Sequence, residues 1–148
     1  MATNLDTFES LIALERRTRK LTFAWFSEHG ISAKTILSIE HGGNYRVSSL
    51  FKLAGLMDCK IEINDKVFNE YIQLGPFLKS LRIRFNVNRV EMSKISGISM
   101  DSLNKLERGG DFTRSTLWKY GYRVGLKWDL LYPLTEYGKL IESSRMNH

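Results

Sequence analysis

Cationic side chains outnumber anionic ones in this chain. Its 148 residues include 22 lysines and arginines against 16 aspartates and glutamates, a formal net charge of +6 with neutral histidines. A positive surface potential attracts phosphate and carboxylate groups, so this excess favours a polyanionic partner. Many basic proteins bind no nucleic acid, and the charge alone is therefore only a first indication.

Residues that could perform catalysis or bind a metal show no recognisable pattern. The three histidines, His29, His41 and His148, lack metal-ligand spacing, and Cys59 is the single cysteine, which excludes an internal disulfide and a cysteine-based zinc site. Cys59 stands in an apolar run, where we expect a small buried side chain. The sequence contains no Ser-His-Asp or Cys-His set and no phosphate-binding glycine loop. It therefore predicts neither an enzyme nor a cofactor.

The hydropathy pattern is that of a cytoplasmic protein. No apolar stretch approaches the roughly 20 residues of a membrane span. The N-terminal sequence MATNLDTFES also lacks a signal-peptide pattern. We therefore expect a soluble chain with no membrane partner.

An internal repeat organises the sequence. Leu11–Ile63, the first copy, aligns without a gap on Leu78–Leu130, the second copy. Identities fall on turn glycines, a capping serine and apolar helix positions, which are positions that fix a backbone. They are Leu11/Leu78, Leu14/Leu81, Arg17/Arg84, Gly30/Gly97, Ile31/Ile98, Ser32/Ser99, Glu40/Glu107, Gly42/Gly109, Gly43/Gly110, Ser48/Ser115, Leu50/Leu117, Lys52/Lys119 and Lys60/Lys127. We expect two lobes, residues 1–66 and residues 67–148 with a C-terminal tail, each too small to be more than marginally stable alone.

Each copy is expected to contain four helices and a short strand. Pro76 favours the first helical position, Asn88 and Ser99 are good N-caps, and Gly97 suits a helix stop. The expected elements are Leu5–Lys20, Thr22–His29, Ser32–Glu40, Ser48–Met57 and the strand Lys60–Ile63, then a helix opened by Gly75-Pro76, a short helix from Asn88 to Gly97, Met100–Glu107, Ser115–Val124 and the strand Lys127–Leu131. For the connector Asn64–Leu74, helical and extended structure both stay open.

A short helix, a glycine turn, a serine-capped helix and a Glu-x-Gly loop resemble the lambda-repressor/Cro-like helix-turn-helix family, also called the xenobiotic-response-element family. The likeness in the second copy is carried by Leu78, Leu81, Arg82, Asn88, Arg89, Met92, Ser93, Gly97, Ile98, Ser99, Leu103, Leu106, Glu107, Gly109 and Leu117. In the first copy it is carried by Leu11, Leu14, Gly30, Ile31, Ser32, Ile36, Ile39, Glu40, Gly42 and Leu50. The resemblance implies a mainly all-α fold of two tandem four-helix helix-turn-helix lobes.

The first copy departs from the family pattern at two places. The family's arginine on helix one, which pairs with the glutamate ending helix three, fits Arg82 and Glu107 in the second copy. The gapless alignment puts Glu15 at that place in the first copy, so Arg16 or Arg17 would have to substitute. Leu21 stands at the cap of helix two, where Thr22 serves only if the helix begins one residue late. In the second copy, Arg89 replaces the family's glutamine at the start of helix two. The first copy is then either a degenerate DNA-binding unit or one with altered geometry.

The resemblance also implies which residues would contact DNA. The third helix of such a unit enters the major groove, and its exposed side chains contact base edges. In the second copy these are Met100, Asp101, Ser102, Asn104 and Lys105, and in the first copy Ala33, Lys34, Leu37 and Ser38. Phosphate contacts would come from the start of helix two and the loop after helix three. The candidates are Thr22, His41, Asn44, Tyr45, Arg46, Ser48, Arg89, Arg108, Thr113, Arg114, Ser115 and Thr116.

The resemblance finally favours a function and an assembly. Some family members dimerise through a strand after helix four, so we expect Lys60–Ile63 and Lys127–Leu131 to pair within one chain as a monomeric pseudo-dimer. The alternatives are a strand confined to each lobe, or a homodimer. The leading hypothesis is a sequence-specific regulator of transcription that binds double-stranded DNA, of phage, mobile-element or antitoxin type, in the bacterial cytoplasm. The alternative is a module that binds a toxin or another protein, in which one lobe has lost its DNA contacts.

Overall fold

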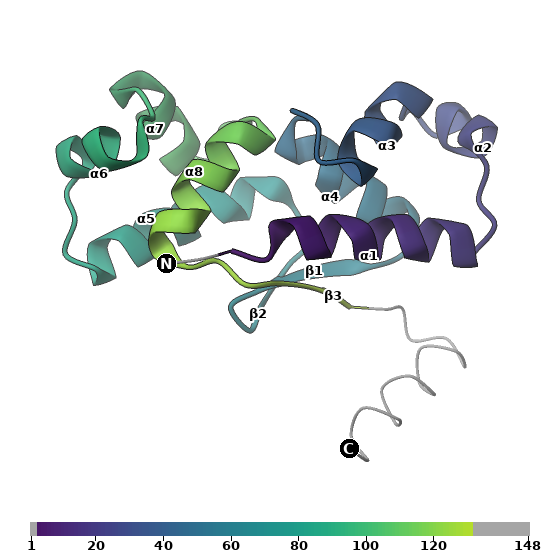
Figure 1. Cartoon of the computed structure of the whole chain (residues 1–148), viewed down its shortest axis with the longest axis horizontal. Helices are drawn as coiled ribbons and strands as arrows, with labels where there is room; N and C mark the ends of the chain where they lie inside the picture. Colours follow the sequence, from purple (N-terminus) through teal and green to yellow (C-terminus); the bar gives the residue numbers. More distant parts are fainter. Residues whose placement is uncertain (1–2, 132–148) are drawn as a thin grey trace, which may run out of the picture.

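The computed structural model describes residues 3–131 as a mainly helical molecule with one small antiparallel sheet (Figure 1). The C-terminal tail and His148, which the sequence assigned to the second lobe, lie outside the described residues. The elements are α1 Leu5–Thr18, α2 Phe23–Glu28, α3 Ala33–Glu40, α4 Val47–Leu56, β1 Lys60–Ile63, β2 Lys66–Phe68, the 3-10 turn η1 Tyr71–Gln73, α5 Leu74–Arg84, α6 Arg89–Ser96, α7 Met100–Glu107, α8 Arg114–Val124 and β3 Trp128–Leu131.

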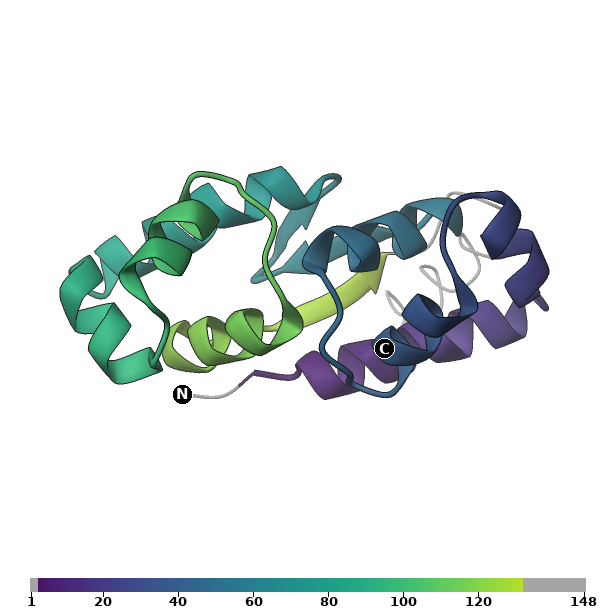
Figure 2. The same ribbon diagram turned by 90° about the horizontal axis from the view of Figure 1, so that it is seen from above.

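The helices form two groups, α1–α4 and α5–α8, that lie side by side above the sheet (Figure 1). Seen from above, β3 extends from the α5–α8 group toward the α1–α4 group (Figure 2). The third helix of each group, α3 or α7, lies on the side of the molecule opposite the sheet. The molecule therefore presents two similar helices on one side.

The predicted caps are confirmed at four helix starts. The side-chain oxygens of Thr22, Ser32, Asn88 and Ser99 each accept a hydrogen bond from a backbone N–H in the first turn of α2, α3, α6 and α7 respectively. These bonds satisfy N–H groups that have no partner within the helix. Gly97 ends α6 with a φ of 78°, the left-handed conformation that favours glycine.

The predicted pairing of the two strands within one chain is also confirmed. β1 and β3 are antiparallel, with Glu62 opposite Asp129 and Ile63 opposite Trp128. The sheet order is β2-β1-β3, and β2 forms a hairpin with β1. The hairpin turn uses Asn64 and Asp65 at φ of 50° and 66°, residue types that tolerate this conformation. The connector is thus an extended hairpin followed by η1.

One hydrophobic core spans both groups of helices. Phe8 of α1 is fully buried, and its ring centroid lies 5.3 Å from that of Trp128 in β3, which follows α8. The Asn4 side chain donates to the Trp128 carbonyl at 2.9 Å and accepts from its N–H. Two groups too small to bury enough apolar surface alone are thereby joined.

The gapless alignment of the repeat is wrong at its N-terminal end. Under that alignment Leu14 matches Leu81, yet Leu14 is 57% exposed and Leu81 is 5% exposed. Burial instead matches Ile12 with Leu78, and the core side chain Phe26 of α2 with Met92 of α6. The first copy is therefore one residue shorter between Phe26 and Gly30 than the second copy is between Met92 and Gly97.

This deletion removes both apparent departures of the first copy. Arg16, and not Glu15, becomes the equivalent of Arg82, and Thr22 becomes the equivalent of Asn88. Arg16 donates to both carboxylate oxygens of Glu40, as Arg82 does to those of Glu107. Glu15 is paired with Arg19, which follows the last residue of α1.

The placement of Pro76 is a second correction. α5 begins at Leu74, so Pro76 is the third helical residue rather than the first. It still lies in the first turn, where a backbone N–H would have no partner in the helix. The preceding Gly75 packs directly on the Leu106 carbonyl of α7, at a spacing that leaves no room for a Cβ atom.

Arg82 and Glu107 allow a test of this core. Both side chains are at most 6% exposed, and the Arg82–Glu107 bonds measure 2.8 and 2.9 Å. Arg82→Ala should lower the free energy of unfolding by about 3–5 kcal/mol, because it removes both close arginine hydrogen bonds from a buried carboxylate and leaves only Arg89, at 3.5 Å, as a nearby cation. Urea unfolding measures the loss. Arg84→Ala removes an exposed arginine nearby and should change stability by at most about 0.5 kcal/mol; equal losses would contradict the role of the pair.

Candidate functional site

The exposed face of α7 carries four of the five proposed base-contacting side chains. Met100 is 37% exposed, and Asp101, Ser102 and Lys105 are also exposed. Asn104 is half-buried, and its Oδ1 atom has no hydrogen-bond partner among the described residues. The opposite face of α7, with Leu103, Leu106 and Glu107, is buried. α7 is thus held by its apolar side and presents a donor, a carboxylate and a hydroxyl outward.

The equivalent face of α3 is less polar. Lys34 is exposed and Leu37 is 41% exposed, whereas Ala33 and Ser38 are half-buried. Ser38 lies against Gly43, where a Cβ atom would come within 3.2 Å of the Ser38 carbonyl oxygen. Lys105 and Gly110 repeat this close contact in the second copy. The sequence-predicted difference between the two faces is therefore present in the structure.

The two loops after α3 and α7 contact each other. We call residues 41–46 and 108–113 the central loops. Arg46 pairs with Thr113 in an antiparallel bridge, the Val47 N–H donates to the Phe112 carbonyl at 2.8 Å, and the Arg114 N–H donates to the Tyr45 carbonyl at 2.8 Å. Arg46 and Thr113 are equivalent positions of the repeat, as are Glu62 and Asp129 in the sheet. In each pair the two equivalent residues lie opposite each other, so both pairs lie on one approximate twofold axis.

Each central loop caps the helix of the other copy. The Asn44 side-chain oxygen accepts a hydrogen bond from the Ser115 N–H at the start of α8. Its equivalent, Asp111, accepts bonds from the N–H and the hydroxyl of Ser48 at the start of α4. The Asx residues are visible in the sequence as cap candidates, but nothing in the sequence indicates that they cap the other copy.

This arrangement removes several residues from the predicted phosphate contacts. The Tyr45 hydroxyl is buried and donates to Glu9, and burial followed by the charge of Glu9 raises the pKa of Tyr45, which keeps the phenol neutral. Arg114 is paired with Glu9 and Asp6. The polar groups of Ser48 bind Asp111. The structure thus assigns Tyr45, Ser48 and Arg114 to contacts within the protein.

The other predicted phosphate contacts remain accessible to different degrees. Thr22, His41, Asn44, Arg46, Arg89, Arg108 and Ser115 are exposed, while Thr113 and Thr116 are half-buried. Arg89 also lies 3.5 Å from Glu107. No pattern in the sequence indicates a buried role for Glu9, since a single glutamate in an amphipathic helix indicates a solvated surface.

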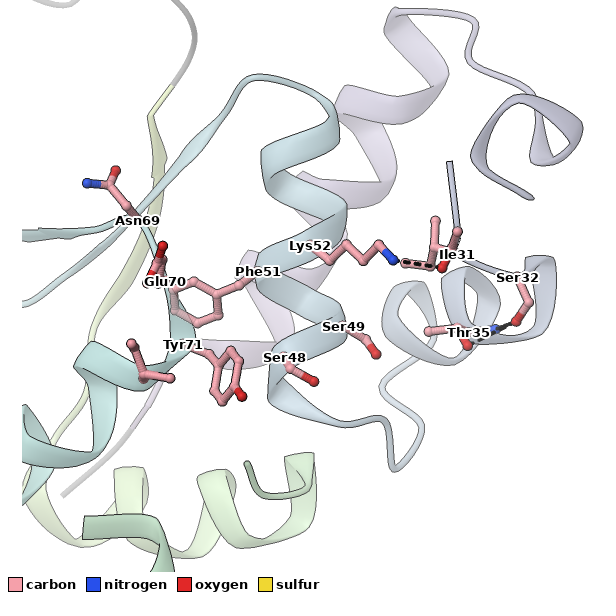
Figure 3. Close-up of a pocket in the computed structure, with 12 residues that line it drawn as sticks. Ile31, Ser32, Thr35, Ser48, Ser49, Phe51, Lys52, Asn69, Glu70 and Tyr71 are labelled. Carbon is pink, nitrogen blue, oxygen red and sulfur yellow. Dashed lines mark hydrogen bonds between the residues drawn. The ribbon is translucent and has the colours of Figure 1, made fainter. Parts of the chain in front are cut away.

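A pocket of about 700 Å³ opens between α3, α4 and residues 69–72 (Figure 3). Lys52 and Glu70 are its charged residues. The Lys52 ammonium donates to the Gly30 carbonyl at 2.9 Å, and the Glu70 carboxylate accepts from the Gln73 backbone in a capping box. Both charges are thus already engaged by the protein.

The cross-capping predicts a difference in stability between two substitutions. Asp111→Ala should cost about 1–2 kcal/mol of unfolding free energy and Asn44→Ala about 1 kcal/mol or less, because Asp111 accepts two bonds at the start of α4 and Asn44 one at the start of α8. Thermal or urea unfolding measures both. Glu28→Ala, on an exposed helix end, is the control, with an expected change within about 0.5 kcal/mol. A harmless Asp111→Ala would show that the contact contributes nothing.

Other kinds of site find no support in the described part of the chain. Residues 3–131 contain no group of three histidine, cysteine, aspartate or glutamate side chains placed to hold a metal ion. None of the helices in this range has the length and apolar composition needed to cross a bilayer. Comparison of the chain with protein-family models, with curated proteins and with solved structures gave no match.

Proposed function

We propose that this chain is a sequence-specific regulator of transcription that binds double-stranded DNA as a single-chain pseudo-dimer. Its two copies would act as tandem helix-turn-helix lobes of the lambda-repressor/Cro-like type. The observation that carries the proposal is the pair α3 and α7. Both are serine-capped, lie on the side opposite the sheet and are related by the approximate twofold axis through the central loops and the β1–β3 pair.

The twofold relation between α3 and α7 supports the proposal of DNA binding, because the backbone of the DNA duplex also has twofold symmetry. A dimeric helix-turn-helix protein places two recognition helices in successive major grooves, about 34 Å apart along one side of the duplex. Here one chain supplies both helices. The net charge of +6 favours the approach to phosphates. The location this implies is the bacterial cytoplasm, at the nucleoid.

The proposed contacts follow from exposure. On α7, Lys105 would donate to guanine, Asp101 would accept from cytosine N4, and Met100 would contact a thymine methyl group. α3 would contribute Ala33, Lys34, Leu37 and Ser38, with weaker sequence discrimination. The phosphate contacts would be Thr22, His41, Asn44, Arg46, Arg89, Arg108 and Ser115, with Thr113 and Thr116 at the edge of this surface.

A second candidate function is binding of a protein partner through the α1–α4 lobe. It is favoured by Leu37, which is 41% exposed beside Ala33 on the face that would otherwise contact bases. The apparent loss of the ion pair in the first copy no longer supports this alternative, because Arg16 pairs with Glu40.

Lys105 provides the sharpest test of base contact. On the DNA site that the wild type selects from a random library, Lys105→Ala should weaken binding by about 1–3 kcal/mol and relax the preference at one base pair. Binding isotherms on the selected site and on random DNA measure the effect. Lys60→Ala removes the same charge from β1, on the side opposite α7, and should leave the base preference unchanged. Equal losses for Lys105→Ala on selected and random DNA would reduce Lys105 to a phosphate contact.

The pseudo-dimer also predicts the form of the DNA site. Because Asp101 and Lys105 differ chemically from their equivalents Lys34 and Ser38, the two half-sites cannot share one sequence. The selected site should be an imperfect inverted repeat bound by one chain, with its more constrained half contacted by α7. Stoichiometry by analytical ultracentrifugation and a nuclease footprint of about two DNA turns check this. Two chains on a perfect palindrome would contradict the pseudo-dimer.

A further inference from the structure

We propose that Glu9 is a positioning residue that fixes the separation of α3 and α7, so that the protein accepts a single spacing between half-sites. This inference rests on the proposed function. It concerns Glu9 of α1 and the three groups around it, Asp6, Tyr45 and Arg114, which we call the Glu9 cluster.

The Glu9 cluster joins the two copies through a buried charge. Glu9 is 2% exposed. Its Oε1 atom accepts from Arg114 Nη2 at 3.0 Å, and its Oε2 atom accepts from Arg114 Nε at 3.2 Å and from the Tyr45 hydroxyl. Arg114 also pairs with the exposed Asp6. A buried carboxylate that accepts three hydrogen bonds resists displacement, because moving it would break its bonds from Tyr45 and Arg114 and leave its charge without compensation.

The positions of these donors connect the cluster to the proposed recognition helices. Tyr45 belongs to the central loop that follows α3, and Arg114 begins α8 directly after the central loop that follows α7. Glu9 therefore contacts both the segment that follows α3 and the segment that follows α7. The central loops themselves are joined near the twofold axis, by backbone hydrogen bonds and by the caps that Asn44 and Asp111 form. The contact of Glu9 with Arg114 lies to one side of that axis.

The cluster exists on only one side of the twofold axis. The equivalents of Glu9, Tyr45 and Arg114 are Gly75, Phe112 and Val47, and these cannot form an ion pair. On that side Gly75 packs directly against α7 at the Leu106 carbonyl and lies close to Gly109. On the other side the Glu9 side chain fills the corresponding space and lies near Gly42. The packing of Gly75 lies within the α5–α8 group, so the ion pair of Glu9 with Arg114 joins the two groups on one side of the axis only.

A fixed separation has a consequence for DNA. Each base pair inserted between half-sites shifts one of them by about 3.4 Å and rotates it by roughly 35° around the duplex. A rigid protein then loses the contacts of one recognition helix. A protein whose central loops can shift recovers part of them and tolerates neighbouring spacings.

The first experiment is a selection from DNA libraries in which the two half-sites are separated by varied spacers. The wild type should bind one spacing best and lose about tenfold or more in affinity when one base pair is added or removed. Glu9→Ala should bind neighbouring spacings within about threefold of each other, with the base preference of each half-site retained. Glu9→Gln, which keeps an acceptor for Tyr45, should fall between the two.

A control separates positioning from general loss of stability. Val124→Ala shortens a core side chain at the end of α8, which is 4% exposed and far from the cluster along that helix. It should retain the single spacing of the wild type. The same broadened spacing in Val124→Ala would assign the effect to destabilisation and overturn the inference.

The second experiment measures the distance between α3 and α7 in the absence of DNA. Spin labels at the exposed equivalent positions, introduced as Lys34→Cys and Asp101→Cys in a Cys59→Ser background, report the distance between α3 and α7 by electron–electron dipolar spectroscopy. The distance distribution should be narrow with Glu9 and broader with Glu9→Ala or, where that variant does not fold, with Glu9→Gln. Equal widths would overturn the positioning role.

The outcomes distinguish this inference from the function on which it rests. A wild type that selects no DNA sequence would overturn the proposed function and the spacing claim together. A wild type that selects a site, combined with an unchanged single spacing in Glu9→Ala, would overturn the inference alone.

Discussion

Antiparallel pairing between equivalent segments is the constraint on which the rest of this structure depends. Glu62 opposes Asp129 in the sheet, and Arg46 opposes Thr113 between the central loops. When two equivalent strands pair antiparallel, a given residue lies opposite its own equivalent in one register only. A shift of one residue would turn every side chain of the strand to the other face of the sheet. Ile61, Ile63, Trp128 and Leu130 are buried on the helix side, which fixes that register. The pair Glu62 and Asp129 and the pair Arg46 and Thr113 together define the twofold axis. The placement of α3 and α7 follows from this axis.

Much of the fold could be predicted from the sequence because its determinants are local. Caps such as Asn88 and Ser99, the left-handed Gly97 and the alternation in Lys60–Ile63 act through their own neighbours in the chain, and each is found where it was predicted. For the connector the sequence left helical and extended structure open, because Asn64-Asp65 followed by three residues gives too short a pattern to separate a strand from a loop.

The rest of the candidate site could not be predicted, for physical reasons that particular residues illustrate. Asn44 and Asp111 have the chemistry of caps, but which helix they cap depends on the contact between copies. Arg114 has the chemistry of a phosphate contact, and its ion pair with Glu9 joins residues 105 positions apart. Chance identities at Leu11, Leu14 and Arg17 favour the gapless alignment and so conceal the one-residue deletion in the first copy. The correct alignment of the two copies is decided by which side chains are buried, and burial is a property of the fold and not of the sequence alone.

A duplicated unit within one chain relaxes a restriction that a homodimer cannot escape. In a homodimer each residue occurs on both sides of the twofold axis, so a buried Glu9 would require a matching carboxylate at the place where Gly75 packs on α7. Within one chain the two sides can differ, and here one side has an ion pair between the copies while on the other Gly75 packs on α7 within the second copy. The same freedom applies to α3 and α7, whose outward faces have already diverged in polarity. The single-chain arrangement therefore permits asymmetry both around Glu9 and at the proposed recognition helices, and under the proposed function the DNA site would carry that asymmetry in its sequence.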